Sequence, residues 1–187
     1  MPGGAEFARM IDELRRLQDR VAESCAPADI VAATADRIAA LADSLAPHAA
    51  GEERRISGRR WDLEGRGQTF VPPVRITESV EHRRTGTVAF STFHLGAGGV
   101  VHGGVIPLVF VEVLGLLANS AGRPLSRMAY LNVDFKAPIR IGTEVGVEAE
   151  FARVEGRKIF IRGSLFEGRL QFATAEALFV VPKESVQ

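Results

Sequence analysis

The sequence has very little cysteine: Cys25 is the only one among 187 residues. A single cysteine excludes a disulfide within the chain and a zinc site built from cysteines. The first residues, MPGGAEFARMIDELRR, also lack the apolar core of a secretory leader, because charged residues begin at once. We therefore expect a cytoplasmic protein.

An excess of charge of either sign is also missing. Lys and Arg total 23, Asp and Glu total 23, and the net charge at pH 7 is +0. A neutral chain has no general attraction for nucleic acid or for an anionic membrane surface, so we predict neither as a partner. The hydrophobic content of 46% and the charged content of 25% are typical of a folded globular protein.

Only one apolar stretch, residues 100–118, approaches the length of a membrane-spanning helix. Pro107, Glu112 and the polar and glycine residues at 102–104 interrupt it. We predict instead a buried helix over residues 105–118, which strands must wrap on most sides because it is apolar nearly all round. Glu112 is its only ionisable residue, and a buried carboxylate is costly unless it is paired or faces a cavity.

The first fifty residues predict a helical hairpin. One apolar stripe recurs at spacings of three and four, and it comprises Phe7, Met10, Ile11, Leu14, Leu17 and Val21. Pro27 suits the first turn of a second helix, and Pro47 ends it. We expect residues 1–50 to pack on the main domain or on a partner chain. We predict that residues 51–68 are a linker with solvated arginines. We predict that residues 69–183 form the main domain and that residues 184–187 are a tail.

The sequence of the main domain predicts strands both before and after the apolar helix along the chain. Alternation starts at Val74 and resumes at Val88 after a turn that we expect near Gly86. Later alternating segments are 129–136, 145–151, 158–166 and 170–181, the last three joined by short turns. Period-two runs joined in this way indicate an antiparallel meander.

One segment of the chain resembles a known family. FHLGAGGVVHGGVIPLVFVEVLG, followed by AYLNVDFKAPIRIG, resembles the hotdog-fold thioesterases of the phenylacetate-degradation (PaaI-like) type, over about residues 60–183. The most specific part is the triplet of residues 102–104, His-Gly-Gly, that opens the apolar helix; Asp134, Pro138 and Gly142 also fit. The resemblance implies an α+β hotdog fold, in which a curved antiparallel sheet wraps around one long central helix, here with the N-terminal helical hairpin in addition.

The resemblance also implies an activity, hydrolysis of an acyl-CoA thioester by a homodimer or a dimer of dimers, without a metal or another cofactor. The backbone N–H groups of Gly103 and Gly104 would form an oxyanion hole at the helix N-terminus, where no side chain blocks the substrate carbonyl. His102 would close the loop or transfer a proton. Gly98 and Gly99 would contact the substrate.

The sequence departs from the family pattern where the family has polar residues. The family carboxylate position falls on Val111, and Glu112 is displaced from it by about 100° around the helix. The position of a Ser or Thr from the facing subunit aligns with Met128, and a loop position often occupied by Asn is glycine. Two hypotheses for Glu112 stay open: it is the catalytic base, or it is a buried, paired glutamate.

Three functions therefore compete. The first is an acyl-CoA thioesterase, and the second is a non-hydrolytic acyl-CoA-binding protein with a degenerate site. A hotdog dehydratase ranks last, because the histidine and carboxylate spacing of those enzymes is missing. Four cations after the helix are candidate contacts for the coenzyme A phosphates, or else ordinary exposed charges: Lys136, Arg140, Arg157 and Lys158.

Overall fold

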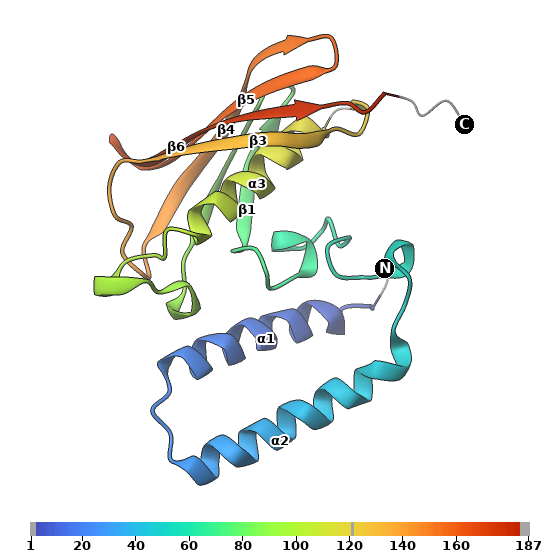
Figure 1. The fold of residues 1–187 in the computed structure, drawn as a ribbon, viewed down its shortest axis with the longest axis vertical. Helices are drawn as coiled ribbons and strands as arrows, with labels where there is room; N and C mark the ends of the chain where they lie inside the picture. Colours follow the sequence, from blue (N-terminus) through green and yellow to red (C-terminus); the bar gives the residue numbers. More distant parts are fainter. Residues whose placement is uncertain (1–2, 121, 184–187) are drawn as a thin grey trace. The chain divides into compact units, whose positions relative to one another are not determined.

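The computed structural model describes residues 3–120 and 122–183. They fall into two compact units, one of residues 1–68 and one of residues 69–187 (Figure 1). We call these the helical unit and the sheet unit and describe each by itself. Within the described residues, no helix combines the length and the apolar character needed to cross a membrane.

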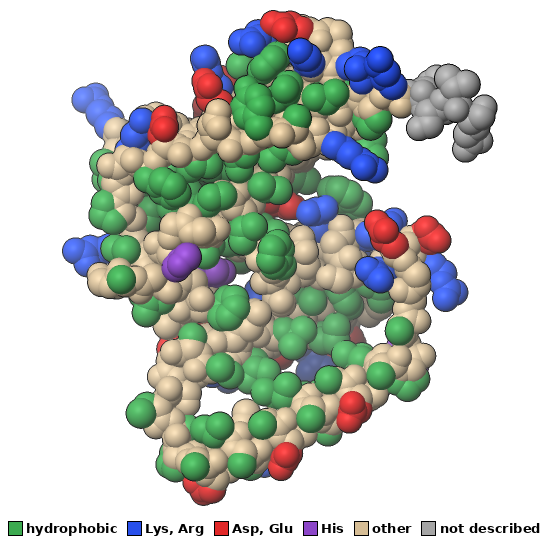
Figure 2. Space-filling view, in the orientation of Figure 1, with side chains coloured by type: hydrophobic (Ala, Val, Ile, Leu, Met, Phe, Trp, Pro, Cys, Tyr) green, Lys and Arg blue, Asp and Glu red, His purple; other side chains and the backbone are tan. Residues whose placement is uncertain are grey.

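The helical unit contains two antiparallel α-helices joined by a short loop. They are α1 (Glu6–Glu23) and α2 (Ala28–Leu45), followed by the short 3-10 helices η1 (Ala46–His48), η2 (Glu52–Arg54) and η3 (Glu64–Gly67). Pro27 is the N-cap of α2, one residue before the first turn in which we expected it, and Pro47 lies just beyond the end of α2, as predicted. Helix α1 buries only Phe7 and Ile11, and α2 buries no residue. Figure 2 shows hydrophobic side chains on the surface along both helices.

Residues 51–68, which we expected to be a linker, fold onto the start of α1. The half-buried Arg15 of α1 donates hydrogen bonds to the carbonyl oxygens of Glu64 (3.0 Å) and Gln68 (2.9 Å). Desolvation lowers the pKa of Arg15 below its ordinary value. These contacts explain why the segment is folded and not an open linker. Arg15, about fifty residues away in the sequence, donates to carbonyl groups that would bind water in a linker.

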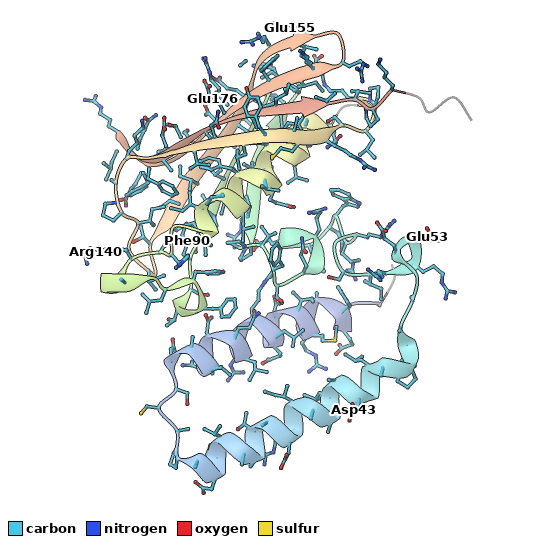
Figure 3. The ribbon with its side chains drawn as sticks, viewed as in Figure 1. Asp43, Glu53, Phe90, Arg140, Glu155 and Glu176 are labelled. Carbon is cyan, nitrogen blue, oxygen red and sulfur yellow. The ribbon has the colours of Figure 1, made fainter. Side chains whose placement is uncertain are left out.

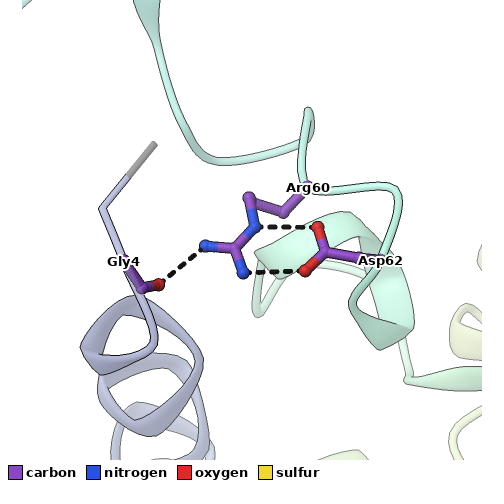
Figure 4. A network of polar contacts seen from close by, with 3 residues as sticks. All are labelled: Gly4, Arg60 and Asp62. Atoms are coloured by element: carbon purple, nitrogen blue, oxygen red, sulfur yellow. Dashed lines mark hydrogen bonds and ion pairs between the residues drawn. The ribbon is translucent and has the colours of Figure 1, made fainter. Parts of the chain in front are cut away.

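Arg60 departs most clearly from the solvated loop that we predicted. Its side chain is buried and forms a forked ion pair with Asp62, with both N···O distances 2.8 Å. A third nitrogen of the guanidinium donates to the carbonyl oxygen of Gly4 at 3.1 Å (Figure 4). The hydrogen bonds from Arg60 hold the pKa of the Asp62 carboxyl below its ordinary value.

The sheet unit is a six-stranded antiparallel sheet with one long helix against one face. The strands are β1 (Val74–Val80), β2 (Arg83–Ala89), β3 (Arg127–Phe135), β4 (Glu144–Glu155), β5 (Lys158–Glu167) and β6 (Leu170–Val180). Their order in the sheet is β1-β2-β4-β5-β6-β3. Helix α3 (Val105–Ala118) lies between β2 and β3 in the chain, after the short 3-10 helices η4 (Thr92–His94) and η5 (Ala97–Gly99).

Helix α3 contacts all six strands, as the prediction of a wrapped apolar helix requires (Figure 1). One position shows how closely it approaches the sheet. A Cβ atom added to Gly163 in β5 would lie 3.0 Å from side-chain atoms of both Phe110 and Leu114. Both of those side chains are fully buried. The missing side chain at Gly163 therefore lets α3 settle on the centre of the sheet.

The turn predicted near Gly86 is wrong. Gly86 lies inside β2, opposite Ile76, and the turn between β1 and β2 falls at residues 81–82. The register of β1 shifts between Ile76 and Glu78, and a Cβ atom on Gly86 would lie 2.3 Å from the carbonyl oxygen of Arg75. Glycine is used here for close approach of two backbones at a bulge, which a sequence pattern cannot distinguish from a turn.

Candidate active site

The N-terminus of α3 is fixed by a hydrogen-bonded loop. The N–H of His102 donates to the carbonyl oxygen of His94 at 2.8 Å, and the N–H of Gly96 donates to that of Val100 at 2.8 Å. The N–H of Val101 donates to the carbonyl oxygen of Ile139 at 2.8 Å, which ties the loop to the segment after β3. The loop position expected to carry Asn aligns with Gly96 or Gly98. A Cβ atom on Gly96 would lie 3.0 Å from the His102 backbone, whereas nothing lies within 4 Å of a Cβ atom on Gly98.

His102 closes this loop with its side chain. The N–H of Gly104 donates to Nδ1 of His102 at 3.0 Å, and the N–H of Val105 donates to the His102 carbonyl oxygen at 2.9 Å. Because Nδ1 accepts a hydrogen bond, the proton of the neutral imidazole resides on Nε2. In this geometry the imidazole positions the first turn of α3, which is the structural role weighed for it from the sequence.

Of the two expected oxyanion donors, only one is open. The Gly104 N–H is bonded to His102, whereas the Gly103 N–H has no acceptor within residues 3–120 and 122–183. Gly103 is exposed, and a Cβ atom added to it would meet only the ring of Phe135, at 3.9 Å. An N–H at a helix N-terminus without a side chain over it can approach a ligand oxygen closely.

Phe135 is a site residue that the sequence analysis did not single out. Its ring lies at the end of β3 beside Gly103 and is 56% exposed. The alternating pattern placed it with the buried face of the strand. Phe135 is the last residue of β3 and lies next to the N-terminus of α3. Its ring is therefore exposed at the rim of residues 102–104, which we call the glycine turn, where an aromatic ring can contact an apolar group.

Helix α3 presents Val111 toward solvent and buries Glu112. Val111 is 43% exposed and lies two turns, about 10 Å, along the helix from Gly104. Glu112 is only 5% exposed, and it is not without a polar partner. The face that begins at the glycine turn therefore carries an apolar residue at the expected carboxylate position, while the neighbouring carboxylate lies on the buried side.

Met128 does not reach the glycine turn of its own chain. It lies at the start of β3, half-buried opposite Phe179 of β6, and it packs against the core. Phe135, at the other end of the same strand, is the residue beside Gly103. Seven residues of strand separate Met128 from Phe135 by about 23 Å. Within one chain, Met128 is therefore a core residue.

Gly98 and Gly99 form a loop that precedes residues 102–104 in the chain and lies beside Arg140. Gly98 and Gly99 are exposed and have left-handed φ values of +68° and +79°, which favour glycine. The N–H of Ile141 donates to the Gly99 carbonyl oxygen at 3.2 Å, and Val100 forms an isolated bridge with Arg140. A ligand held over Gly98 and Gly99 would thus have one exposed cation at the edge of the loop.

The four candidate cations do not form one cluster. Lys136 and Arg140 follow β3 near the glycine turn, whereas Arg157 and Lys158 lie at the tip of the β4–β5 hairpin. The length of β4, about 36 Å, separates the two pairs. In Figure 3 the labels Arg140 and Glu155 mark these two ends. The Arg157 guanidinium also donates a hydrogen bond to the carbonyl oxygen of Val181 at 2.8 Å. The Nζ atom of Lys136 forms an ion pair with Oδ2 of Asp134 at 3.5 Å.

The described residues contain no group of three or more His, Cys, Asp and Glu side chains that could hold a metal ion. The site offers one open N–H donor at a helix N-terminus (Gly103), an apolar helix face (Val111) and an exposed aromatic ring (Phe135).

Residues 98–171, which include the glycine turn, α3 and strands β3 to β5, match the thioesterase superfamily. The acyl-coenzyme A thioesterase THEM4 of Mus musculus is 32% identical over 101 residues, which are 52% of this chain and 43% of that protein. THEM4 of Rattus norvegicus is 33% identical over 87 residues. The matched segments thus span less than half of the length of these relatives.

Solved structures extend the comparison to the whole chain. A crystal structure of a thioesterase superfamily protein superimposes with a TM-score of 0.81 at 26% identity and covers 96% of this chain and 92% of that one. The PaaI protein from the phenylacetic acid degradation operon of E. coli has a TM-score of 0.54 at 15% identity and covers 57% of this chain and 82% of its own. The sheet wrapped around one helix is thus the fold that the sequence predicted.

Proposed function

We propose that the chain is a hotdog-fold thioesterase that hydrolyses an acyl or aryl thioester of coenzyme A, since residues 98–171 match the thioesterase superfamily and the fold is that of a solved thioesterase superfamily protein. The observation that carries this proposal is the open N–H of Gly103 at the N-terminus of α3. The carbonyl oxygen of a thioester bound there would accept a hydrogen bond from this N–H, and the helix dipole would favour the negative charge that develops on it.

Hydrolysis follows in two steps from that geometry. Water attacks the carbonyl carbon and loses a proton, and the oxyanion of the tetrahedral intermediate is held at Gly103. The intermediate then collapses, the C–S bond breaks, and coenzyme A leaves as the thiol or thiolate. His102 contributes by fixing the turn through its Nδ1 contact with Gly104. Glu112 is the candidate base that accepts the proton from water.

A second function is supported by a different observation. Val111 occupies the exposed helix face two turns from the glycine turn, and Glu112 is buried. An apolar face beside one N–H donor can bind a thioester without supplying a base. The alternative is therefore a protein of the same fold that binds acyl-CoA and does not hydrolyse it.

We further propose that the working form is a homodimer or a dimer of dimers. Strand β3 is at one edge of the sheet and pairs only with β6. An uncovered strand edge is a template for pairing with another chain. Tyr130 and Phe135 on this strand are exposed, as is Val111 on α3. A second copy would cover these apolar side chains and complete the surroundings of Gly103.

Release of free thiol from a panel of acyl-CoAs tests both functions. If Glu112 is the base, Glu112→Gln abolishes turnover, while the matched variant Glu167→Gln, at the exposed last residue of β5, keeps it. Circular dichroism checks that Glu112→Gln is folded. Turnover that survives in Glu112→Gln assigns the base elsewhere. Absence of turnover with every ester, together with binding of acyl-CoA by calorimetry, would support the binding protein instead.

A further inference from the structure

A separate group of polar side chains lies at the other end of the sheet unit from the glycine turn. Arg84 in β2 is paired in register with Ser79 in β1 on one side and with Ala149 in β4 on the other. Side chains opposite each other in register point to the same face of a sheet. Ala149 is fully buried against the core, so Arg84 and Ser79 lie on the face that packs on α3.

The carboxylates of these strands lie on the opposite face. Glu148 is in register with Thr85, and Glu150 is in register with Arg83. Glu78 is also in register with Thr85 and pairs with Arg83, with an N···O distance of 3.3 Å. Strand alternation thus gives the arginine at position 83 acidic neighbours and gives Arg84 none.

The side chain of Arg84 makes no hydrogen bond or ion pair within residues 3–120 and 122–183. Its Nε atom is shielded from solvent and has no hydrogen-bond partner. Burial is the sole cause that lowers the pKa of Arg84 below its ordinary value, and no neighbouring acid opposes it. A half-buried guanidinium in this state has desolvated N–H donors that an anion can use.

Arg123 brings a second guanidinium to the same face. It lies in the segment after α3, with its Cζ atom 4.4 Å from the centroid of the Phe151 ring. Its Nε atom is also buried without a partner. Phe151 is two residues from Ala149 in β4 and on the same face, which makes it a diagonal neighbour of Arg84 at about 7–8 Å. Both arginines are therefore on the face of the sheet that carries Phe151.

The end of α3 does not use these arginines. The carbonyl oxygen of Gly115 accepts hydrogen bonds from the backbone and side chain of Asn119, at 3.2 and 3.1 Å. The carbonyl oxygen of Leu117 accepts from the backbone and hydroxyl of Ser120, at 3.2 and 2.8 Å. Arg84 and Arg123 are thus not explained as caps for these helix carbonyls.

We propose that Arg84 and Arg123, together with the hydroxyl of Ser79, bind a phosphate group at the C-terminal end of α3. Guanidinium groups donate hydrogen bonds and accept none, so two of them without a carboxylate between them match a doubly charged oxyanion. The length of α3, about 20 Å, separates this phosphate site from Gly103. The proposal therefore stands whether or not the glycine turn hydrolyses thioesters.

Binding of inorganic phosphate, measured by calorimetry at constant ionic strength, tests the site. We expect the full-length protein to bind phosphate and Arg84→Gln or Arg123→Gln to bind it at least about tenfold more weakly, since each removes a charge-assisted hydrogen bond. Arg127→Gln is the matched control, because Arg127 is exposed on β3. It should bind phosphate as the unchanged protein does.

Two results would overturn the proposal: no phosphate binding by the unchanged protein, or an equal loss in Arg127→Gln, which would indicate general attraction to positive charge. Circular dichroism checks each variant, and Arg123→Gln decides alone if Arg84→Gln does not fold. Coenzyme A and dephospho-coenzyme A then identify the source of the phosphate. A preference for coenzyme A over dephospho-coenzyme A that both arginine variants lose assigns the 3′-phosphate of coenzyme A to the site. Equal competition of the two compounds with inorganic phosphate assigns the diphosphate that they share, and no competition by either assigns a free phosphate.

Discussion

At the scale of single residues, Val111 decides what the glycine turn can do. It is exposed on the helix face that starts at Gly104, whereas Glu112 is buried. We predict that Val111→Asp raises the rate of thiol release from acyl-CoA at least about tenfold, since a positioned base contributes roughly 10²–10⁴-fold to proton transfer. Leu125→Asp, at another exposed apolar position, is the control. An unchanged rate in folded Val111→Asp would show that the exposed face does not contact the water.

Gly163 shows how strictly one residue can control packing. An added Cβ atom would lie 3.0 Å from the fully buried Phe110 and Leu114. We predict that Gly163→Ala lowers the free energy of unfolding by about 1–3 kcal/mol, because two fully buried side chains would have to shift to admit the methyl group. Gly115→Ala should instead raise it by about 0.5–1 kcal/mol, since nothing lies within 4 Å of the added atom in the interior of α3. Urea denaturation measures both, and equal effects would contradict the packing argument.

The sequence predicted which residues form the glycine turn but not how they are bonded. The His-Gly-Gly triplet identified Gly103 and Gly104 as backbone donors. The structure leaves only the Gly103 N–H open, because Nδ1 of His102 takes the other. That outcome depends on the rotamer of one imidazole within a loop tied to Ile139, a contact between segments that no local pattern contains. The exposure of Phe135 depends on the same tertiary arrangement.

At the scale of elements, the end of α3 depends on Asn119. Its Nδ2 donates to the Gly115 carbonyl oxygen, and its Oδ1 accepts from the backbone N–H (2.7 Å) and the hydroxyl (3.1 Å) of Ser126. Ser126 is buried. We predict that Asn119→Ala lowers the free energy of unfolding by about 1–3 kcal/mol, because it leaves buried donors unpaired. Asn132→Ala, at an exposed position of β3, should change it by less than about 0.5 kcal/mol. Similar losses in the two variants would refute this.

The elements themselves were largely predictable, and the exceptions have a common cause. The central helix was predicted over residues 105–118, as α3 is, and the three strands of the meander correspond to β4, β5 and β6. Periodicity works there because each element has one face against the same core. It fails at Gly86, where the neighbouring backbone of Arg75 dictates glycine. Contacts between backbones leave no periodic signal.

At the scale of the whole molecule, the chain has two units with unequal cores. All residues of the main hydrophobic core lie in the sheet unit, between Val74 and Phe179. The buried side chains of the helical unit are those of Phe7 and Ile11 of α1 and the ion-paired Arg60; α2 buries no residue, and the other buried residues, Gly65 and Gly67, have no side chain. A low content of apolar residues suggested a linker over residues 51–68, but specific hydrogen bonds from Arg15 and Arg60 fold that segment onto α1.

This inequality predicts that the sheet unit folds alone. A protein of residues 69–187 should unfold in one cooperative transition within about 5 °C of the main transition of the full chain, a shift that corresponds to about 1 kcal/mol in a domain of this size. A fragment of residues 1–68 should show little cooperative unfolding, because a helix of 18 residues without a buried face is marginal in water. Differential scanning calorimetry of both fragments and of the full chain measures this. Loss of the transition from the 69–187 fragment would mean that the sheet unit requires the helical unit, and the division of the core between Val74 and Phe179 would then not describe the stability of the protein.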